Sequence, residues 1–367
     1  MPTLESDGDG DEPTTRVRAR ARERDRERAR PEPRSRGLRV LAVLVVVLVV
    51  LVTAVAAGAT LWVGHLAKTW SAGVGTVEAP FRSAAERPAD AEPGAVDVLL
   101  LGTDSRDPEA VVDVGAAGPT GGRSDTMVLV HLGADRRDVQ VVSLMRDLWV
   151  PVPGNGEAKL NAAMAWGGVP LAVATVEDLL GTRIDHVAVV DFEGFREVTD
   201  ALGGVDVESP VAFEAQGHTF LAGTNHLRGD AALAFVRARH PFADGDYARV
   251  RNQQAFLRGV ARQLVSRETL RDPGRLTSTV QAIAPWVSVD ADLDLPTIVA
   301  LGASLRSVPA DRVVTDTVPT RGTTMIGDQS VVLPDEQGIA AWRQRLSAGQ
   351  GPLDEVRERD RGAAATD

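Results

Sequence analysis

The sequence predicts an α/β protein, an α/β/α sandwich with a mixed central sheet, preceded by one transmembrane helix. Two observations predict the sandwich. Three short apolar runs between residues 96 and 145 have the form of an antiparallel meander, and later apolar runs of strand length alternate with segments of helical spacing. A long uninterrupted apolar run at 40–63 predicts the membrane helix.

The three apolar runs of the meander are each bounded by charged residues. The first, Val96–Leu101, is rich in Leu and Val and stops at Gly102, which is typical of a buried strand. The second and third, Thr126–Leu132 and Val139–Met145, are joined by GADRRD, whose Gly and Asp residues favour a hairpin turn. If the second run also pairs antiparallel with the first, the end of strand one, the start of strand two and the end of strand three share one edge of the sheet.

That edge would collect three pairs of charged residues, Asp104 with Arg106, Arg123 with Asp125, and Arg146 with Asp147. Charges beside a buried sheet are costly unless they are compensated. One interpretation is a rim of salt bridges. The other is a binding site, in which carboxylates hold a cation and arginines bind an anion such as phosphate, whose oxygens suit the planar guanidinium fork.

The N-terminal part of the chain predicts a membrane anchor. Residues 1–39 are almost without apolar side chains and rich in arginine, which predicts a disordered arm. The Val/Leu/Ala run at 40–63 is long enough to cross a bilayer, and the arginines before it predict a cytoplasmic N-terminus. A signal peptide cleaved near AVA at 54–56 is the alternative, but the run exceeds the roughly 7–15 residues of a signal core.

The remainder of the chain is expected outside the membrane. Residues 64–94, broken by prolines, predict a stalk; residues 95–346 predict the globular domain, and residues 347–367 a disordered polar tail. The absence of cysteine excludes disulfides and cysteine metal sites, and the net charge of −11 argues against nucleic-acid binding. The histidines lack paired metal-ligand spacing, and neither a GxSxG elbow nor a P-loop occurs.

Periodicity predicts the elements that follow the meander. Extended segments are expected at 149–152, 186–192, 205–210 and 313–319, and helices at 170–181, 194–204, 227–240, 246–270, 279–287 and 294–308.

The long helix expected to start near Asp246 carries polar residues on the stripe that should face inward. Arg249 and Gln253 are one turn apart and continue into Phe256 and Val260. Asp246 stands where it can cap the helix, and a helix N-terminus favours anions. An ion pair between Arg249 and the strand-edge carboxylates explains the same pattern without a ligand.

Three further cations stand out. Arg237 and Arg239 are two residues apart, so in an extended segment both side chains would point to the same side. Arginine carries nearly all the positive charge of the chain, because Lys68 and Lys159 are its only lysines. That bias lowers the weight of any single arginine and raises that of Lys159.

These segments together resemble the LytR-CpsA-Psr family, membrane-anchored enzymes that attach glycopolymers to the bacterial cell wall. The matching segments are LLLGTDSR (99–106), GRSDT (122–126), SLMRD (143–147), KLNAAMAWGG (159–168), IDHVAVVDFEGF (184–195), LGGVDV (202–207), LRGDAALAFVRARH (227–240) and DYARVRNQQ (246–254). They follow the family's order and approximate spacing. The chain departs from the family at Met145, where Pro is usual, at Leu148, where Thr or Ser is common, and at Asn252, where Arg is common.

The resemblance implies a site for the pyrophosphate of a polyprenyl-linked glycan. Carried over residue by residue, it comprises Asp104, Arg123, Asp125, Arg146, Lys159, Arg237, Arg239, Arg249 and Gln253. The catalytic candidates among them are Asp104, Asp125, Arg146 and Arg249. Asp104 or Asp125 would hold Mg²⁺ (or Mn²⁺), which takes hard oxygen ligands. The family's lipid also needs an apolar tunnel, for which Trp166, Phe192 and Phe195 are candidates that ordinary core packing explains equally well.

The function that the resemblance implies is transfer of a glycopolymer from polyprenyl pyrophosphate onto a peptidoglycan hydroxyl, by analogy that of muramic acid. Hydrolysis of polyprenyl pyrophosphate is a side activity that the same chemistry permits. The implied partners are the lipid-linked glycan donor, the peptidoglycan acceptor and the membrane, with no nucleic acid. The polymer is left open: teichoic acid, arabinogalactan and a capsule-like chain all fit.

Two other classes of function are retained. A non-catalytic binder of lipid-linked envelope precursors is favoured by the absence of arginine at position 252. A membrane-bound transcriptional regulator is the second, but the predicted anchor, the acidic net charge and the lack of a helix-turn-helix pattern argue against contact with DNA.

Overall fold

The computed structural model describes residues 61–103, 124–239, 242, 245–264, 273–306, 308–309 and 312–348. The chain divides into two compact units, Met1–Val63 and Gly64–Asp367, and the fold described here is that of the second. The arm at 1–39, almost all of the anchor at 40–63 and almost all of the tail at 347–367 lie outside the described residues. Those three assignments stay predictions.

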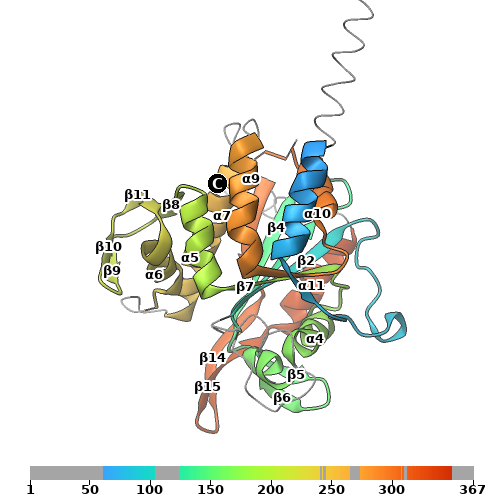
Figure 1. Cartoon of the computed structure of the whole chain (residues 1–367). Helices are drawn as coiled ribbons and strands as arrows, with labels where there is room; N and C mark the ends of the chain where they lie inside the picture. The colour runs from blue at the N-terminus through green and yellow to red at the C-terminus, as the bar shows by residue number, and fades with distance from the viewer. Residues whose placement is uncertain are drawn as a thin grey trace, which may run out of the picture. The chain divides into compact units, whose positions relative to one another are not determined.

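A seven-stranded mixed sheet forms the centre of the second unit (Figure 1), in the order β1-β12-β7-β2-β3-β4-β13. Its strands are β1 (Gly75–Val77), β2 (Val96–Thr103), β3 (Ser124–Leu132), β4 (Val139–Leu144), β7 (His186–Asp191), β12 (Val287–Asp290) and β13 (Val313–Thr317). β2, β3 and β4 pair antiparallel in succession, as the meander predicted, while β2 pairs parallel with β7, β4 with β13, and β1 with β12.

Helices cover both faces of this sheet, which confirms the three-layer prediction. Leu99 and Leu101 of β2 belong to a core that includes side chains of α4 (Leu160–Leu180) and α11 (Glu336–Ser347). On the opposite face, Leu100 packs in a second cluster together with residues of α7 and α10. This alternation along one strand is the period of two that separates the faces of a sheet.

The helices on the second face are α7 (Asp246–Leu264), α9 (Pro273–Ile283) and α10 (Leu295–Ser304). Beside them a separate apolar cluster joins α5 (Phe192–Ala201), α6 (Gly229–Arg237) and two small hairpins. The hairpins pair β8 (Val205–Ser209) with β11 (Gly223–Leu227), and β9 (Phe213–Ala215) with β10 (His218–Phe220). Phe213, Phe220 and Phe235 stack within 5.6 Å of one another and hold the cluster together.

α4 is the one helix of the described chain that is long and apolar enough to cross a membrane, and 61% of its apolar window is buried within the fold. Its apolar side chains belong to the core under the sheet. The helix bends at Gly167 and Gly168, where Gly168 has φ 60° and ψ −152°, a conformation that glycine adopts most readily. Pro170 follows directly and lacks the N–H that an unbroken helix would use.

The predicted stalk at 64–94 is wrong for much of its length, because these residues belong to the folded unit. β1 forms an edge strand of the central sheet, and Val77 is 3% exposed. A 3-10 turn (Ala84–Glu86) follows, and the Arg87 guanidinium pairs with Glu177 of α4. The expected start of the domain at residue 95 is therefore too late.

Several elements toward the C-terminus differ from the predicted pattern. The helix expected at 279–287 ends in a 3-10 turn (Ala284–Trp286), and Val287 already belongs to β12. The extended segment expected at 149–152 is β5 (Trp149–Val152), but its partner β6 (Gly156–Lys159) was not predicted. The hairpin of β14 (Thr320–Ile326) with β15 (Gln329–Pro334) had no counterpart in the prediction. α11 was also not predicted.

Candidate functional site

The register of the meander confirms that three strand ends share one edge of the sheet. Gly102 of β2 lies opposite Thr126 of β3, and Met127 of β3 lies opposite Leu144 of β4. The chain that follows Leu144 therefore emerges beside the start of β3. Arg146 and Asp147 lie at this edge, as the sequence predicted.

Part of the predicted site lies outside the described residues. Asp104 and Arg123 fall in the segment between β2 and β3 that the structure leaves undescribed. Asp125 belongs to β3, next to Thr126, so its backbone lies at the same edge. The pairing of the Asp104 and Asp125 carboxylates, and their role as metal ligands, stay predictions.

The carboxylate of Asp246, the first residue of α7, lies at the centre of a cluster of arginines. Its Oδ1 is 2.7 Å from Nε of Arg239, and its Oδ2 is 2.9 Å from Nη2 of Arg249. Arg146 approaches the same Oδ2, with its Nε at 3.9 Å. Asp246 thus joins the end of β4, the segment after α6 and the start of α7. We expected Asp246 to act as a helix cap; it is the first residue of α7, and its carboxylate oxygens contact these guanidiniums.

Asp147 forms a second carboxylate centre next to the first. Its Oδ1 is 3.1 Å from Nζ of Lys159, and its Oδ2 is 3.5 Å from Nε of Arg146. Burial would raise the pKa of Asp147, but the hydrogen bond from Lys159 and the charges of Arg146 and Lys159 outweigh it, so the pKa lies below its ordinary value. Asp147 is therefore a carboxylate at neutral pH, with Lys159 and Arg146 beside it.

The β5–β6 hairpin brings Lys159 into the site. Lys159 pairs with Trp149 across the hairpin, and the chain then turns into α4. The N–H of Asn161 donates to the carbonyl of Arg146 at 3.0 Å, which ties the start of α4 to the end of the meander. Arg146 and Lys159, separated by a hairpin in the sequence, are fixed side by side in this way.

Arg249 and Gln253 lie on the inward stripe of α7, as their spacing predicted. Arg249 is 5% exposed and Gln253 is 9% exposed. The side-chain amide of Gln253 donates to Oγ1 of Thr126 at 2.9 Å, so it links α7 to the start of β3. Phe256, one turn farther along, is buried in the apolar cluster that joins α5, α6 and the two small hairpins.

Arg237 and Arg239 differ from their prediction. Arg237 is the last residue of α6 and is exposed, while Ala238 is extended with φ −61° and ψ 119°. The two arginines therefore do not both lie in an extended segment, and the argument that they point to the same side fails. Arg239 makes the contact with Asp246 described above.

Position 252, where the family commonly has arginine, has a structural role in this chain. Asn252 is 5% exposed, and its side-chain amide donates to the carbonyl of Phe235 at 3.2 Å. Gln253 reaches the neighbouring carbonyl of Val236 at 3.5 Å. These bonds satisfy carbonyls in the last turn of α6, which otherwise lack a partner within the helix.

The aromatic residues considered for a lipid tunnel do not form one group. Trp166 is 47% exposed at the bend of α4. Phe195 packs against Phe256 in the helical cluster, with ring centroids 4.7 Å apart. Nothing is described of the Phe192 side chain.

Among the residues that the structure describes, the cluster has an excess of positive charge. Its members among the described residues are the cations Arg146, Lys159, Arg239 and Arg249 and the carboxylates Asp147 and Asp246. Four cations and two carboxylates give these six residues a net charge of +2. All six side chains are at most 41% exposed. A partly buried cluster of this kind suits an anion with several oxygens, such as a pyrophosphate.

The described carboxylates are poor metal ligands in this arrangement, because Asp147 and Asp246 are both paired with cations. No group of three or more potential metal-ligating side chains occurs in the part of the chain that the structure describes. Asp104 and Asp125 have the oxygen chemistry that Mg²⁺ requires.

Comparison with known proteins identifies relatives of both sequence and fold. The polyisoprenyl-teichoic acid–peptidoglycan teichoic acid transferase TagU of Bacillus anthracis is 37% identical over 197 residues, which cover 53% of this chain and 61% of TagU. The match spans about three fifths of the length of that relative.

Solved structures share the fold at lower identity. The crystal structure of Bacillus subtilis TagV has a TM-score of 0.60 at 24% identity and covers 71% of this chain and 98% of TagV. A structure of TagT bound to LI-WTA has a TM-score of 0.55 at 24% identity and covers 71% and 92% of the two chains. The LytR_cpsA_psr family model matches residues 75–347, from β1 to the end of α11. The chain therefore belongs to the LytR-CpsA-Psr family.

Proposed function

We propose that this protein transfers a glycopolymer from a polyprenyl pyrophosphate carrier to a hydroxyl of peptidoglycan. The observation that carries the proposal is the partly buried cluster around Asp246, with its excess of positive charge at one edge of the sheet. Family membership supports the reaction class. The name of the TagU relative specifies a polyisoprenyl-linked teichoic acid and peptidoglycan, which supports these two substrates for this chain.

In the proposed reaction, an acceptor hydroxyl oxygen attacks the phosphorus that carries the glycan. A P–O bond to that oxygen forms, the P–O bond to the polyprenyl phosphate breaks, and a phosphodiester and polyprenyl phosphate result. Negative charge spreads over the phosphate oxygens during such a transfer, so catalysis is mainly positioning and electrostatic stabilisation. Arg146, Arg239, Arg249 and Lys159 would bind those oxygens, with Asp246 and Asp147 holding the cations in position.

The other predicted residues complete this assignment. Gln253, whose amide donates to Thr126 and to the carbonyl of Val236, would hold α7 against β3 beside the bound phosphates. Arg123 and Arg237 would contribute further positive charge at the rim. One of Asp104 and Asp125 would accept the proton of the acceptor hydroxyl.

A divalent cation, Mg²⁺ or Mn²⁺, is part of the proposal. When bound, it would neutralise phosphate charge and polarise the phosphorus centre. Asp104 and Asp125 would hold it, because the described carboxylates Asp147 and Asp246 are engaged with cations.

The proposed location is the outer side of the cell membrane. The apolar run at 40–63 would anchor the chain as a single span, with the arginine-rich arm in the cytoplasm and the catalytic domain outside.

The test is transfer by the full chain in detergent, with a polyprenyl-pyrophosphate glycan as donor and peptidoglycan fragments as acceptor. We expect phosphodiester product that depends on Mg²⁺, with some polyprenyl pyrophosphate hydrolysis when the acceptor is left out. Arg146→Ala and Arg239→Ala should each lower the rate about ten- to a hundredfold, because a charge-assisted hydrogen bond is worth roughly 1.5–3 kcal/mol.

A matched control is Arg137→Ala, which removes an arginine that is 81% exposed on the β3–β4 turn. Its rate and melting temperature should stay near those of the wild type. Tight binding of the donor with no turnover at any metal concentration would instead identify a precursor-binding protein. Early melting of Arg146→Ala and Arg239→Ala would make these arginines structural and remove them from the site.

A further inference from the structure

A second cavity lies along α7, lined by residues other than those that surround Asp246. Its volume is about 620 Å³, within the range of small-ligand pockets. It is lined by Glu208, Ser209, Pro210, Val211, Phe242, Ala248, Arg251, Asn252, Gln254, Ala255 and Arg258. None of these residues belongs to the arginine cluster at the sheet edge.

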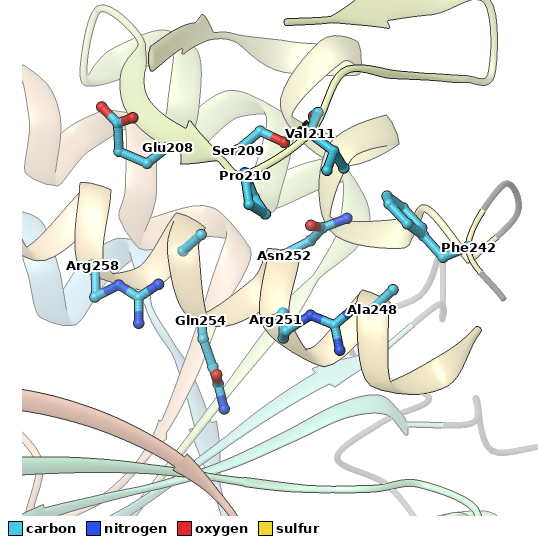
Figure 2. Close-up of a pocket in the computed structure, with 11 residues that line it drawn as sticks. Glu208, Ser209, Pro210, Val211, Phe242, Ala248, Arg251, Asn252, Gln254 and Arg258 are labelled. Carbon is cyan, nitrogen blue, oxygen red and sulfur yellow. Dashed lines mark hydrogen bonds between the residues drawn. The ribbon is translucent and has the colours of Figure 1, made fainter. Parts of the chain in front are cut away.

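One wall of the cavity carries arginines, and the segment across from it combines Glu208 and Ser209 with the apolar Pro210 and Val211. Figure 2 shows the segment from Glu208 to Val211 running across from α7, with Arg251 and Arg258 extending from the helix. Seven residues separate the two arginines, so they lie two turns apart on the same side of α7. Pro210 and Val211 provide the apolar surface that faces them.

Arg258 and Arg262 form a pair of neighbouring cations one turn apart on α7. Arg258 donates to Oγ1 of Thr315, and Arg262 donates to the carbonyl of Asp206 at 3.3 Å. Within the described residues neither guanidinium forms an ion pair with a carboxylate, and each has further N–H donors beyond the one used. Partial burial and the charge of Arg262 lower the pKa of Arg258 from its ordinary value, so an added anion would be favourable here.

The other polar groups of the cavity have partners of their own. The Asn252 amide donates to Phe235, and the Gln254 amide donates to Ser143 and to the carbonyl of Asp316. Glu208 is the one carboxylate on the lining, and it accepts a hydrogen bond from the Thr224 hydroxyl. Among the lining residues, Arg258 keeps the N–H donors noted above for contacts to a ligand.

We propose that this cavity binds a phosphate-bearing stretch of an acidic glycopolymer. Arg251 and Arg258 line the cavity, and Arg262 lies one turn beyond it on α7. The three arginines rise along the helix in steps of about 10 Å and about 6 Å, which suits a ligand that carries repeated charges rather than one. The apolar wall suits the C–H faces of sugar or polyol units between those charges. The proposal rests on the proposed function for the identity of the polymer.

The shape of the site favours a chain over a membrane surface. A bilayer is broad and flat, while Arg251 and Arg258 line a cavity together with Pro210, Val211 and Phe242. Val211, at 47% exposed, is the one large exposed apolar side chain on the lining. Membrane-binding surfaces instead present a broader apolar face.

The far end of the cavity, at Arg258, lies at a distance from the reacting phosphate, while the near end begins at Ala248, next to Arg249 on α7. Arg258 is three turns of α7 beyond Asp246, a rise of roughly 18 Å. A donor that carries a single sugar would not span that distance, whereas a long chain would. The cavity would therefore strengthen the binding of long donors and leave the rate of the chemical step unchanged.

The experiment measures binding of a fluorescent poly(glycerol phosphate) chain, without lipid or pyrophosphate, to the full-length protein in detergent. Arg258→Gln and Arg262→Gln should each weaken binding about tenfold, because each removes charge-assisted contacts to phosphate. Val211→Glu, which places a carboxylate on the opposite wall, should weaken it to a similar degree. Arg137→Gln makes the same change of charge on the β3–β4 turn and should leave the affinity unchanged.

Each result decides for or against the cavity. Equal affinity of the wild type, Arg258→Gln and Val211→Glu for the chain would overturn the proposal, whatever the transfer activity. Loss of binding to phosphatidylglycerol vesicles in Arg258→Gln, with chain binding intact, would overturn it in favour of a membrane contact. In the transfer assay, Arg258→Gln should raise KM for long donors and leave KM for a single-sugar donor unchanged. Absence of transfer in every variant, with chain binding lost only in the cavity variants, would refute the proposed function and keep the cavity.

Discussion

At the scale of single residues, Asp246 has the largest number of functional partners. Its carboxylate contacts Arg146, Arg239 and Arg249, which come from three different parts of the chain. Without this negative charge the three guanidiniums would repel one another. Asp246 is therefore a residue whose charge holds the anion site together before any anion arrives.

Asp246→Asn tests this role, since it keeps the shape of the side chain and removes its charge. We expect the free energy of unfolding to fall by about 1–3 kcal/mol, because Arg249, with a side chain 6% exposed, would lose its charged partner. Urea denaturation measures this change. Inorganic pyrophosphate should restore part of the loss by supplying the missing negative charge.

Asp135→Asn is the matched control, because Asp135 is 54% exposed and pairs with Arg137 on the β3–β4 turn. An exposed pair of this kind contributes about 0–1 kcal/mol, so the control should stay near the wild type. If Asp246→Asn were as stable as this control, with no response to pyrophosphate, the cluster would not depend on Asp246.

The sequence indicated some of these residues and missed the role of others. Arg249 and Gln253 were predicted because helical spacing places them on the same stripe as Phe256. Asp246 was interpreted as a helix cap, because position at a helix start is a local property. Its partnership with Arg146 depends on how β4 and α7 meet, and no local pattern contains that information.

At the scale of secondary-structure elements, the two ends of β2 and β3 have different chemistry. Far from the arginine cluster, His131 of β3 is 2% exposed between two carboxylates. Its Nδ1 is 2.7 Å from Oδ1 of Asp97, and its Nε2 is 3.2 Å from Oε2 of Glu92. Burial lowers the pKa of His131, but the hydrogen bond and charge of Asp97, with those of Glu92, outweigh burial and raise the pKa above its ordinary value.

This arrangement predicts that stability falls as pH rises. A histidine with a raised pKa contributes stability that is fully present below its unfolded pKa of about 6.5 and is lost as pH rises through the folded pKa. His186, beside Asp290, has its pKa raised in the same direction, so it adds to the wild-type slope. The Asp185 carboxylate lies beside Asp97 and accepts a hydrogen bond from the backbone N–H of Asp97.

The contribution of His131 is isolated by comparing the wild type with His131→Gln. The free energy of unfolding of the wild type should fall more steeply between pH 6 and pH 9 than that of His131→Gln, because the variant keeps His186 but lacks the imidazolium. Urea titrations at several pH values give both slopes. Parallel slopes would mean that the charged state of His131 does not contribute to folding.

Burial explains which secondary-structure elements could be predicted from the sequence. β2, β3, β4 and β7 are apolar runs with charged or glycine boundaries, because they lie inside the sheet with helices on both faces. β14 is largely exposed and pairs only with β15, so the segment TRGTTMI contains no buried alternation. β12 was missed because it follows a 3-10 turn directly, with no loop residues to mark its start.

At the scale of the whole molecule, the segment before residue 95 is part of the folded domain. β1 pairs with β12 at the edge of the sheet, and the Arg87 guanidinium lies 2.7 Å from Oε1 of Glu177 in α4. The Glu177 side chain is fully buried, at 0% exposed, and also accepts from the N–H of Ile184 at 3.1 Å. Arg82 of the same segment also pairs with Glu177 and Asp178. The proline-rich composition of this segment suggested a stalk, since neither a three-residue edge strand nor a few ion pairs have a periodic pattern.

The same arrangement predicts the behaviour of two shortened chains, one that begins at residue 64 and one that begins at residue 95. Loss of Arg87 leaves the buried Glu177 carboxylate without its closest cation, and removing one partner of a buried pair costs about 3–5 kcal/mol. The chain that begins at 95 should therefore melt at a clearly lower temperature.

Glu177→Gln gives the sharper measurement, because its effect should change sign between the two chains. In the longer chain it breaks the pair with Arg87 and should destabilise the fold, whereas in the shorter chain it removes an uncompensated charge and should raise the melting temperature. An effect of the same sign in both chains would show that the Arg87–Glu177 pair does not hold the N-terminal segment to α4.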